Sequence, residues 1–138
     1  AGRQEEVRLS TPCEPELYIQ ADPDLLRVVL ENLVDNGLKY GGEKPLVEIA
    51  VAHCDDIIGI AVSDKGIGFD ASVQEAIFTP YRRALSDGHK VHHGTGLGLS
   101  IARNLCRKMG GDLVAMSRGV NQGATFTVTL QAAPQETV

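Results

Sequence analysis

Apolar and polar residues alternate along much of the chain with a period of two, which is typical of half-buried β-strands. The alternation predicts strands at 7–9, 17–19, 47–51, 58–62, 113–117 and 124–130. The third and fourth of these segments flank the turn residues Cys54-Asp55-Asp56 and predict a β-hairpin. The last two segments predict a second hairpin.

Two other segments repeat apolar residues every three to four positions, which is the period of an amphipathic helix. The first begins with Asp22 as N-cap and Pro23, ends at Gly41-Gly42, and has a predicted apolar stripe of Leu26, Leu30, Leu33 and Gly37. The second begins near Leu97, ends at Gly110-Gly111, and has a predicted stripe of Leu97, Ile101, Leu105 and Met109. Together the elements predict an α+β two-layer sandwich, with helices on one face of a mostly antiparallel sheet.

Length and composition agree with one domain over 1–138, with its core at about 7–130. The net charge of −5 excludes a nucleic-acid binder that depends on a broad basic field. Residues 57–62 are the longest strongly apolar stretch, too short to span a bilayer, and no signal peptide opens the chain, so we expect no direct membrane contact. Cys13, Cys54 and Cys106 form no C-x-x-C pair, which predicts buried thiols in a reducing, cytoplasmic compartment.

The first predicted helix carries polar residues beside its apolar stripe. Asn32, Asn36 and Tyr40 follow one another at intervals of one turn, and Lys39 lies next to Asn36. A carboxamide oxygen is a suitable ligand for Mg²⁺, and an ammonium group suits a phosphate. The alternative is a pair of solvated asparagines on the edge of the helix.

Asp64 has the same strand parity as Ile60 and Val62, so its carboxylate is predicted to face the core side. A carboxylate there needs hydrogen-bond donors. Gly66 and Gly68 follow it and allow the backbone to approach a flat ligand. An adenine site, in which Asp64 accepts from the exocyclic amino group, is one interpretation, and an ordinary Asp-x-Gly turn is the other.

A glycine-rich segment, Gly94-Thr95-Gly96-Leu97-Gly98-Leu99-Ser100, leads into the second predicted helix. Free N–H groups at the start of a helix favour anions, so we expect phosphates to bind there. The segment is neither the G-x-G-x-x-G dinucleotide motif nor a P-loop, because it lacks a glycine at 99 and a Gly-Lys-Ser/Thr ending.

Four motifs, in order, together resemble the catalytic ATP-binding domain of bacterial sensor histidine kinases. Residues 31–40 are similar to the N box, 64–68 to the first glycine box, 77–83 to the F box and 94–100 to the second glycine box. These kinases share their fold with gyrase, the Hsp90 chaperones and MutL, so the resemblance implies that fold for about residues 7–130. Lys65 departs from the family pattern, which usually has Asn at that position.

The resemblance implies Mg²⁺ and ATP as cofactors and assigns their contacts. Asn36 would coordinate Mg²⁺, Asn32 would lie near that ion and the γ-phosphate, and Lys39 would reach a phosphate. Tyr40 would flank the base or ribose, and Asp64 would accept from the adenine amino group. The base pocket would also include Gly66, Gly68 and the hydroxyl of Thr125.

The resemblance also implies a lid at about 84–95, which we expect to become ordered on nucleotide binding. Phe78 and Tyr81 would anchor its hinge in the core. Arg82 or Arg83 would approach the phosphates or the acceptor domain, and Lys90 would approach the phosphates. The phosphates would be cradled by Gly94, Thr95, Gly96, Leu97, Gly98 and Leu99. The lid contains His89-x-x-His92-His93, for which zinc binding is an alternative interpretation.

The implied function is to supply the γ-phosphoryl group of ATP to a histidine on a separate dimerisation domain, and through it to a response regulator. No histidine of this chain has the sequence context of an acceptor, so we expect a monomer that lacks its acceptor. Two alternatives stay open. An ATPase of the gyrase or MutL type would need a Glu at the position of Asn32 as general base. A nucleotide-binding scaffold would bind without transfer.

Overall fold

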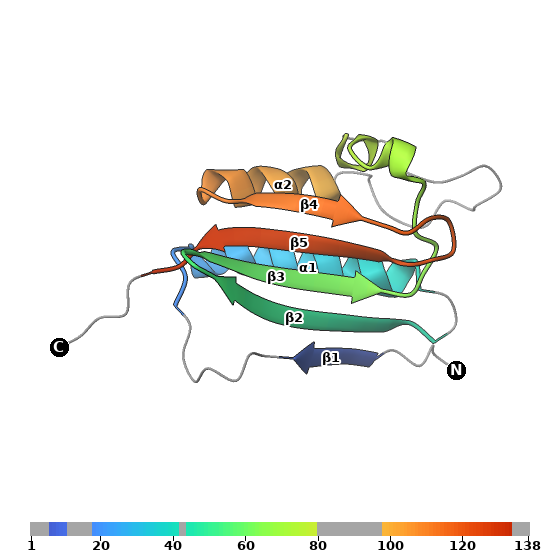
Figure 1. Cartoon of the computed structure of the whole chain (residues 1–138), viewed down its shortest axis with the longest axis horizontal. Helices are drawn as coiled ribbons and strands as arrows, with labels where there is room; N and C mark the ends of the chain where they lie inside the picture. The colour runs from blue at the N-terminus through green and yellow to red at the C-terminus, as the bar shows by residue number, and fades with distance from the viewer. Residues whose placement is uncertain (1–5, 11–17, 42–43, 80–97, 134–138) are drawn as a thin grey trace.

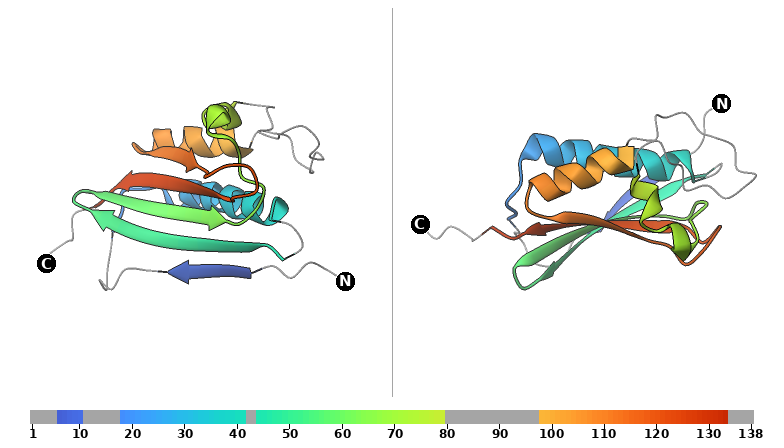
Figure 2. Two further views of the ribbon diagram at one scale, coloured as in Figure 1. Left: turned by 45° about the vertical axis from the view of Figure 1, so that its right-hand side comes forward. Right: turned by 90° about the horizontal axis from the view of Figure 1, so that it is seen from above.

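The structure, a computed structural model, describes residues 6–10, 18–41, 44–79 and 98–133. In these residues five strands form one sheet, and two helices cover one of its faces (Figures 1 and 2). The elements are β1 (Glu6–Ser10), α1 (Pro23–Lys39), β2 (Leu46–Cys54), β3 (Ile57–Asp64), the short 3₁₀ helices η1 (Ala71–Val73) and η2 (Ala76–Phe78), α2 (Gly98–Lys108), β4 (Asp112–Met116) and β5 (Ala124–Gln131). The predicted α+β two-layer architecture is confirmed.

The strand order is β1-β2-β3-β5-β4, so β3 lies at the centre of the sheet. Both predicted hairpins are confirmed as antiparallel pairs, β2 with β3 and β4 with β5. β1 instead pairs with β2 in parallel, with α1 as the connection between them. The sheet is therefore not built of hairpins alone.

The predicted strand at 17–19 is wrong for the residues that the structure describes. Ile19 makes one isolated antiparallel bridge, to Ala132, and no regular strand. The backbone here pairs with the end of β5, because Gln20 donates to the carbonyl of Gln131. Asp22 then caps α1, which leaves no length for a longer strand.

The start and buried face of α1 follow from its sequence. The Asp22 carboxylate accepts from the backbone N–H groups of Asp24 at 2.9 Å and Leu25 at 3.3 Å, as an N-cap should. The buried residues are Val29, Leu33 and Gly37, spaced one turn apart. Leu26 and Leu30 of the predicted stripe are partly buried beside them, and Val29 is the member that the prediction omitted.

The predicted apolar stripe of α2 is only partly confirmed, and it is wrong for Ile101. Ala102 and Cys106 face the core, whereas Ile101 is 42% exposed. Leu105 and Met109 are partly buried at the margin of the core, and Leu97 lies outside the described residues. The short side chains of Ala102 and Cys106 allow the helix to pack close to the sheet, which a row of large residues would prevent.

The predicted end of α2 is confirmed. Gly111 donates to the carbonyl of Cys106 and Gly110 to that of Arg107, which is a Schellman motif, with Gly110 at a φ of +85°.

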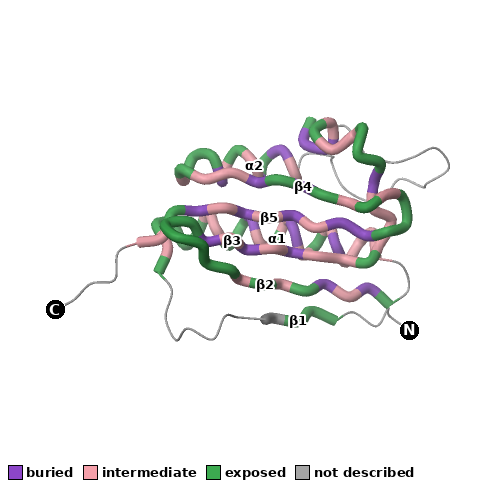
Figure 3. Tube along the Cα trace, in the orientation of Figure 1, coloured by how far each residue is buried: buried purple, intermediate pink, exposed green. Residues whose placement is uncertain are grey.

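The core lies between the helices and the covered face of the sheet (Figure 3). Its largest fully buried side chains include Leu33, Ile58, Leu113 and Leu130. Cys106 is buried as predicted, but Cys54 is exposed, because it ends β2 at the tip of the hairpin. Cys13 lies outside the described residues. No helix that the structure describes is long and apolar enough to cross a membrane.

Candidate functional site

Asp64 ends the central strand β3 on its covered face, next in parity to the buried Val62. One carboxylate oxygen accepts from the backbone N–H of Gly66 at 2.9 Å. Burial raises the pKa of Asp64, and hydrogen bonds from the backbone of Gly66 and Ala124 oppose that rise. The site is therefore built around a half-buried carboxylate, for which an additional donor would be favourable.

Two glycines allow the end of α1 and the loop after β3 to close around Asp64. A Cβ atom on Gly37 would lie 3.5 Å from the Cβ atom of Asp64 and 2.8 Å from Cγ2 of Val47. A Cβ atom on Gly66 would overlap the carbonyl oxygen of Tyr40, to which the N–H of Ile67 donates at 3.3 Å. The N-box helix and the first glycine box are thus joined by backbone contacts.

Gly68 allows the same loop to approach the β4–β5 connection. Its φ is +58°, and a Cβ atom would overlap the carbonyl oxygen of Gly119 and lie 2.7 Å from that of Gly123. The close approach to two carbonyl oxygens requires glycine here.

Ser117 holds this loop in place and was missed by the sequence analysis. Its hydroxyl oxygen accepts from the N–H of Phe69 at 3.1 Å, and the hydroxyl group lies 2.6 Å from the carbonyl oxygen of Gly123. Leu113 and Ala115 are buried and have the same strand parity as Ser117. The alternation along β4 could therefore have predicted that Ser117 faces the covered side of the sheet.

The polar residues of α1 lie beside the buried stripe, as their spacing predicts. Asn32, Asn36 and Tyr40 are all half-buried. The side chain of Asn32 lies near the first residue of α2, where a Cβ atom on Gly98 would be 3.6 Å from its Oδ1 atom. The N box and the described end of the second glycine box therefore meet at this point. Lys39 forms an ion pair with Asp35, one turn earlier, at 3.0 Å.

Thr125 lies apart from this group. It is the cross-strand partner of Ser63, and its hydroxyl lies 3.0 Å from that of Ser63. Successive side chains alternate between the two faces of a sheet, so Thr125 and Asp64 point to opposite faces. The residue across from Asp64 is Ala124, which is buried. The structure does not bring the Thr125 hydroxyl to the Asp64 carboxylate.

The F box is described as far as residue 79. Ile77 and Phe78 are buried, so Phe78 occupies the core as predicted. The other F-box, lid and phosphate-loop residues of the predicted site lie outside the described residues: Tyr81, Arg82, Arg83, Lys90, Gly94, Thr95, Gly96, Leu97 and the cluster His89, His92 and His93. Leu99 is described and is partly buried.

The chemistry of the described donors suits a magnesium ion that shares its ligands with a phosphate group. Asn32 and Asn36 offer neutral carboxamide oxygens from one half-buried row of α1. Mg²⁺ is usually held by few protein ligands, together with water and substrate phosphates. In the described part of the chain no group of three or more His, Cys, Asp and Glu residues could form a separate metal centre.

Comparisons with known proteins identify the family of the chain. Residues 21–134 match the family described as histidine kinase-, DNA gyrase B- and HSP90-like ATPases. The sensor histidine kinase ZraS of Klebsiella oxytoca is 37% identical over 132 residues, which are 94% of this chain and 27% of ZraS. The chain spans between 19% and 37% of the first curated relatives that it matches.

Solved structures show the same fold. The mycobacterial sensor histidine kinase MprB superimposes with a TM-score of 0.82 at 20% identity, over 95% of this chain and 86% of that chain. Full-length ShkA, solved in complex with AMPPNP, gives a TM-score of 0.77 at 27% identity, over 95% of this chain and 27% of that chain. The chain therefore belongs to the family of histidine kinase-, DNA gyrase B- and HSP90-like ATPases, as an ATPase domain of the sensor histidine kinase type.

Proposed function

We propose that this domain binds Mg-ATP and supplies the γ-phosphoryl group to a histidine on a separate dimerisation domain, from which it passes to a response regulator. The observation that carries the proposal is the half-buried carboxylate of Asp64, enclosed by Gly37 and Gly66. The ShkA structure, whose fold this chain shares, contains AMPPNP, an ATP analogue, which supports a nucleotide as the ligand.

Asp64 recognises the base in this proposal. Its carboxylate already accepts from the Gly66 N–H, and its remaining lone pairs suit the exocyclic amino group of adenine. Guanine presents a carbonyl oxygen in place of that amino group, so a carboxylate opposite it would be repelled. Gly66 and Gly68 let the backbone of this loop pack against Tyr40 and the β4–β5 connection beside the base site, and Tyr40 flanks the base or ribose.

The phosphates lie toward the start of α2. Backbone N–H groups at a helix N-terminus attract anions, and Asn32 lies beside that terminus. Asn36 would hold Mg²⁺, which would neutralise phosphate charge, and Lys39, which pairs with Asp35 in this structure, would bind a phosphate oxygen instead. Arg82, Arg83, Lys90 and residues 94–97 would complete the phosphate contacts, so that the domain acts by positioning and charge neutralisation.

Transfer to a partner is favoured over hydrolysis by the residue at position 32. Activation of water requires a general base within reach of the γ-phosphate, and a carboxamide cannot accept a proton in that role. Glu31 is exposed and lies about 100° around the helix from Asn32. The described part of α1 therefore offers no carboxylate at the position where hydrolytic members of the fold carry one.

Calorimetry with ATP and GTP tests the base site. Asp64→Asn should reduce the preference for ATP, whereas Asp56→Asn, in the exposed hairpin turn, should leave it unchanged. An unchanged preference in Asp64→Asn would show that the carboxylate does not contact the base.

The metal and transfer steps have separate tests. Asn36→Ala should bind ATP equally with and without Mg²⁺, whereas the parent chain should bind more tightly with Mg²⁺.

Labelled ATP and a histidine-containing dimerisation domain of a related sensor kinase should give phosphohistidine on that domain. Release of inorganic phosphate without phosphohistidine would instead support an ATPase.

A further inference from the structure

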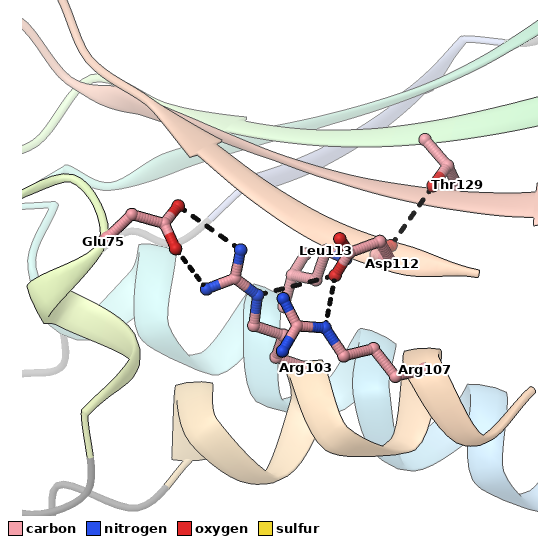
Figure 4. Close-up of polar contacts among 6 residues, drawn as sticks. All are labelled: Glu75, Arg103, Arg107, Asp112, Leu113 and Thr129. Carbon is pink, nitrogen blue, oxygen red and sulfur yellow. Dashed lines mark hydrogen bonds and ion pairs between the residues drawn. The ribbon is translucent and has the colours of Figure 1, made fainter. Parts of the chain in front are cut away.

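Arg103 joins three separate elements through one side chain (Figure 4). From α2, its guanidinium donates to both carboxylate oxygens of Glu75, at 2.8 and 3.3 Å. Its Nε atom lies 3.5 Å from the carboxylate of Asp112, the first residue of β4. Its central carbon lies 4.1 Å from the centroid of the Phe78 ring in η2.

Arg103 is the buried partner in these contacts, whereas the side chains of Glu75 and Asp112 are 71% and 41% exposed. The side chain of Arg103 is only 12% exposed, and exposed pairs are usually weak because water screens them. The two-point contact with Glu75 fixes the plane of the guanidinium group, and the ring of Phe78 contributes a cation–π contact. The hydrogen bond from Arg103 also lowers the pKa of Glu75.

Arg103 adds directional polar contacts to the packing of α2. The fully buried residues of α2 are small, Ser100, Ala102 and Cys106, and three larger residues pack at the margin of the core: Leu99, Leu105 and Met109. From the middle of α2, the guanidinium group of Arg103 contacts Glu75, which precedes η2, and Asp112, which begins β4. Arg103 lies just over one turn from Gly98, the residue beside Asn32.

We propose that Arg103 is a positioning residue, which fixes the start of α2 relative to the carboxylate of Asp64. The inference rests on the proposed function, in which the start of α2 holds the phosphates and Asp64 holds the base. A nucleotide must contact both at once, so a small displacement of α2 weakens the phosphate contacts and spares the base contact.

The test compares the affinities for ATP and adenosine by calorimetry in three variants of the whole chain. Arg103→Met keeps an apolar side chain against Phe78 but removes the charge. It should weaken ATP binding by at least about tenfold, while the affinity for adenosine changes by less than about twofold. Arg103→Lys should recover part of the ATP affinity, because one ion pair can form. Arg107→Met is the matched control, because Arg107 also binds Asp112, at 3.0 Å, but from a side chain that is 53% exposed, whereas the two-point hydrogen bond to Glu75 comes from Arg103.

Glu75→Gln tests the same link from an exposed side chain, 71% accessible, which is not needed for the core. It should lower the affinity for ATP, as Arg103→Met does. Equal ATP affinity in the parent chain, Arg103→Met and Glu75→Gln would overturn the inference, as would an equal loss of ATP and adenosine affinity. If the parent chain binds neither ligand, the proposed function fails instead, so the two failures are distinguishable.

Discussion

Gly37 of α1 lies directly against Asp64 of β3. A Cβ atom on Gly37 would come 3.5 Å from the Cβ atom of Asp64, and it would meet Cγ2 of Val47 at 2.8 Å. Val47 is fully buried, so its side chain has no free space to move into. The glycine therefore sets how closely the N-box helix approaches the carboxylate of the base site.

Gly37→Ala should destabilise the fold even though alanine favours helices. The gain in helix propensity is about 1 kcal/mol, and overpacking of a buried site costs about 1–3 kcal/mol. We expect a net loss of about 1 kcal/mol in the free energy of unfolding, measured with urea. ATP affinity should fall as well, because relief of the collision with Val47 displaces α1, which carries Asn32 and Asn36, from the sheet. Gly59→Ala is the control, since its added Cβ atom would only touch Thr127 at 3.7 Å. If Gly37→Ala is more stable than the parent chain, the predicted collision with Val47 is wrong.

Asp64→Asn should stabilise the domain while it impairs nucleotide binding. Burial raises the pKa of Asp64 above its ordinary value of 3.8, so the folded chain holds this proton more tightly than the unfolded chain. The stability from this group is complete below pH 3.8 and is lost as the pH rises through the folded pKa. Thermal unfolding at several pH values should show the variant above the parent at pH 7, with the difference shrinking toward pH 4. A constant difference would exclude titration of Asp64 as the cause.

Two glycines with positive φ, Gly110 and Gly68, allow the cost of backbone strain to be measured apart from the cost of steric collision. Gly110→Ala has no atom within 4 Å of the added Cβ atom, so it should cost only the left-handed conformation, about 1 kcal/mol. Gly68→Ala adds collisions with the carbonyl oxygens of Gly119 and Gly123, and should cost at least about 2 kcal/mol more. Equal losses in urea unfolding would show that the loop after β3 can relax.

The two described cysteines should differ in reactivity. Burial raises the pKa of the Cys106 thiol to about 11, so only about one thiol in a thousand is ionised at pH 8. Cys54 is exposed at the hairpin tip. Brief alkylation followed by peptide mass spectrometry should label Cys54 in the native protein and Cys106 only in urea. Equal native labelling would mean that α2 opens readily.

The elements that depend on a local sequence pattern could be predicted from the sequence. The alternation around Cys54-Asp55-Asp56 determined both the β2–β3 hairpin and the side of the sheet that Asp64 faces, because parity links the two. The caps of α1 and α2 were predictable for a similar reason, since Asp22 and Gly110 have side-chain or backbone properties that few other residues share.

Features that depend on distant contacts could not be predicted in this way. β1 has no adjoining turn that reveals its partner, and it pairs in parallel with β2. Ile101 is the more hydrophobic residue, yet Ala102 occupies the interface, because the distance between α2 and the sheet favours small side chains. Thr125 was placed by the family resemblance, and its parity puts the hydroxyl on the other face, against Ser63.

The strand order has a consequence for how the domain is synthesised. β5 is the last strand in the chain, yet it lies between β3 and β4 and pairs with the strand that carries Asp64. A nascent chain that has emerged only as far as β4 already contains Asn32, Asp64 and the start of α2, but it lacks the partner that completes the centre of the sheet. Long-range pairing of this kind is slow to form. Nucleotide binding would therefore report the insertion of β5 between β3 and β4, the step that completes the sheet.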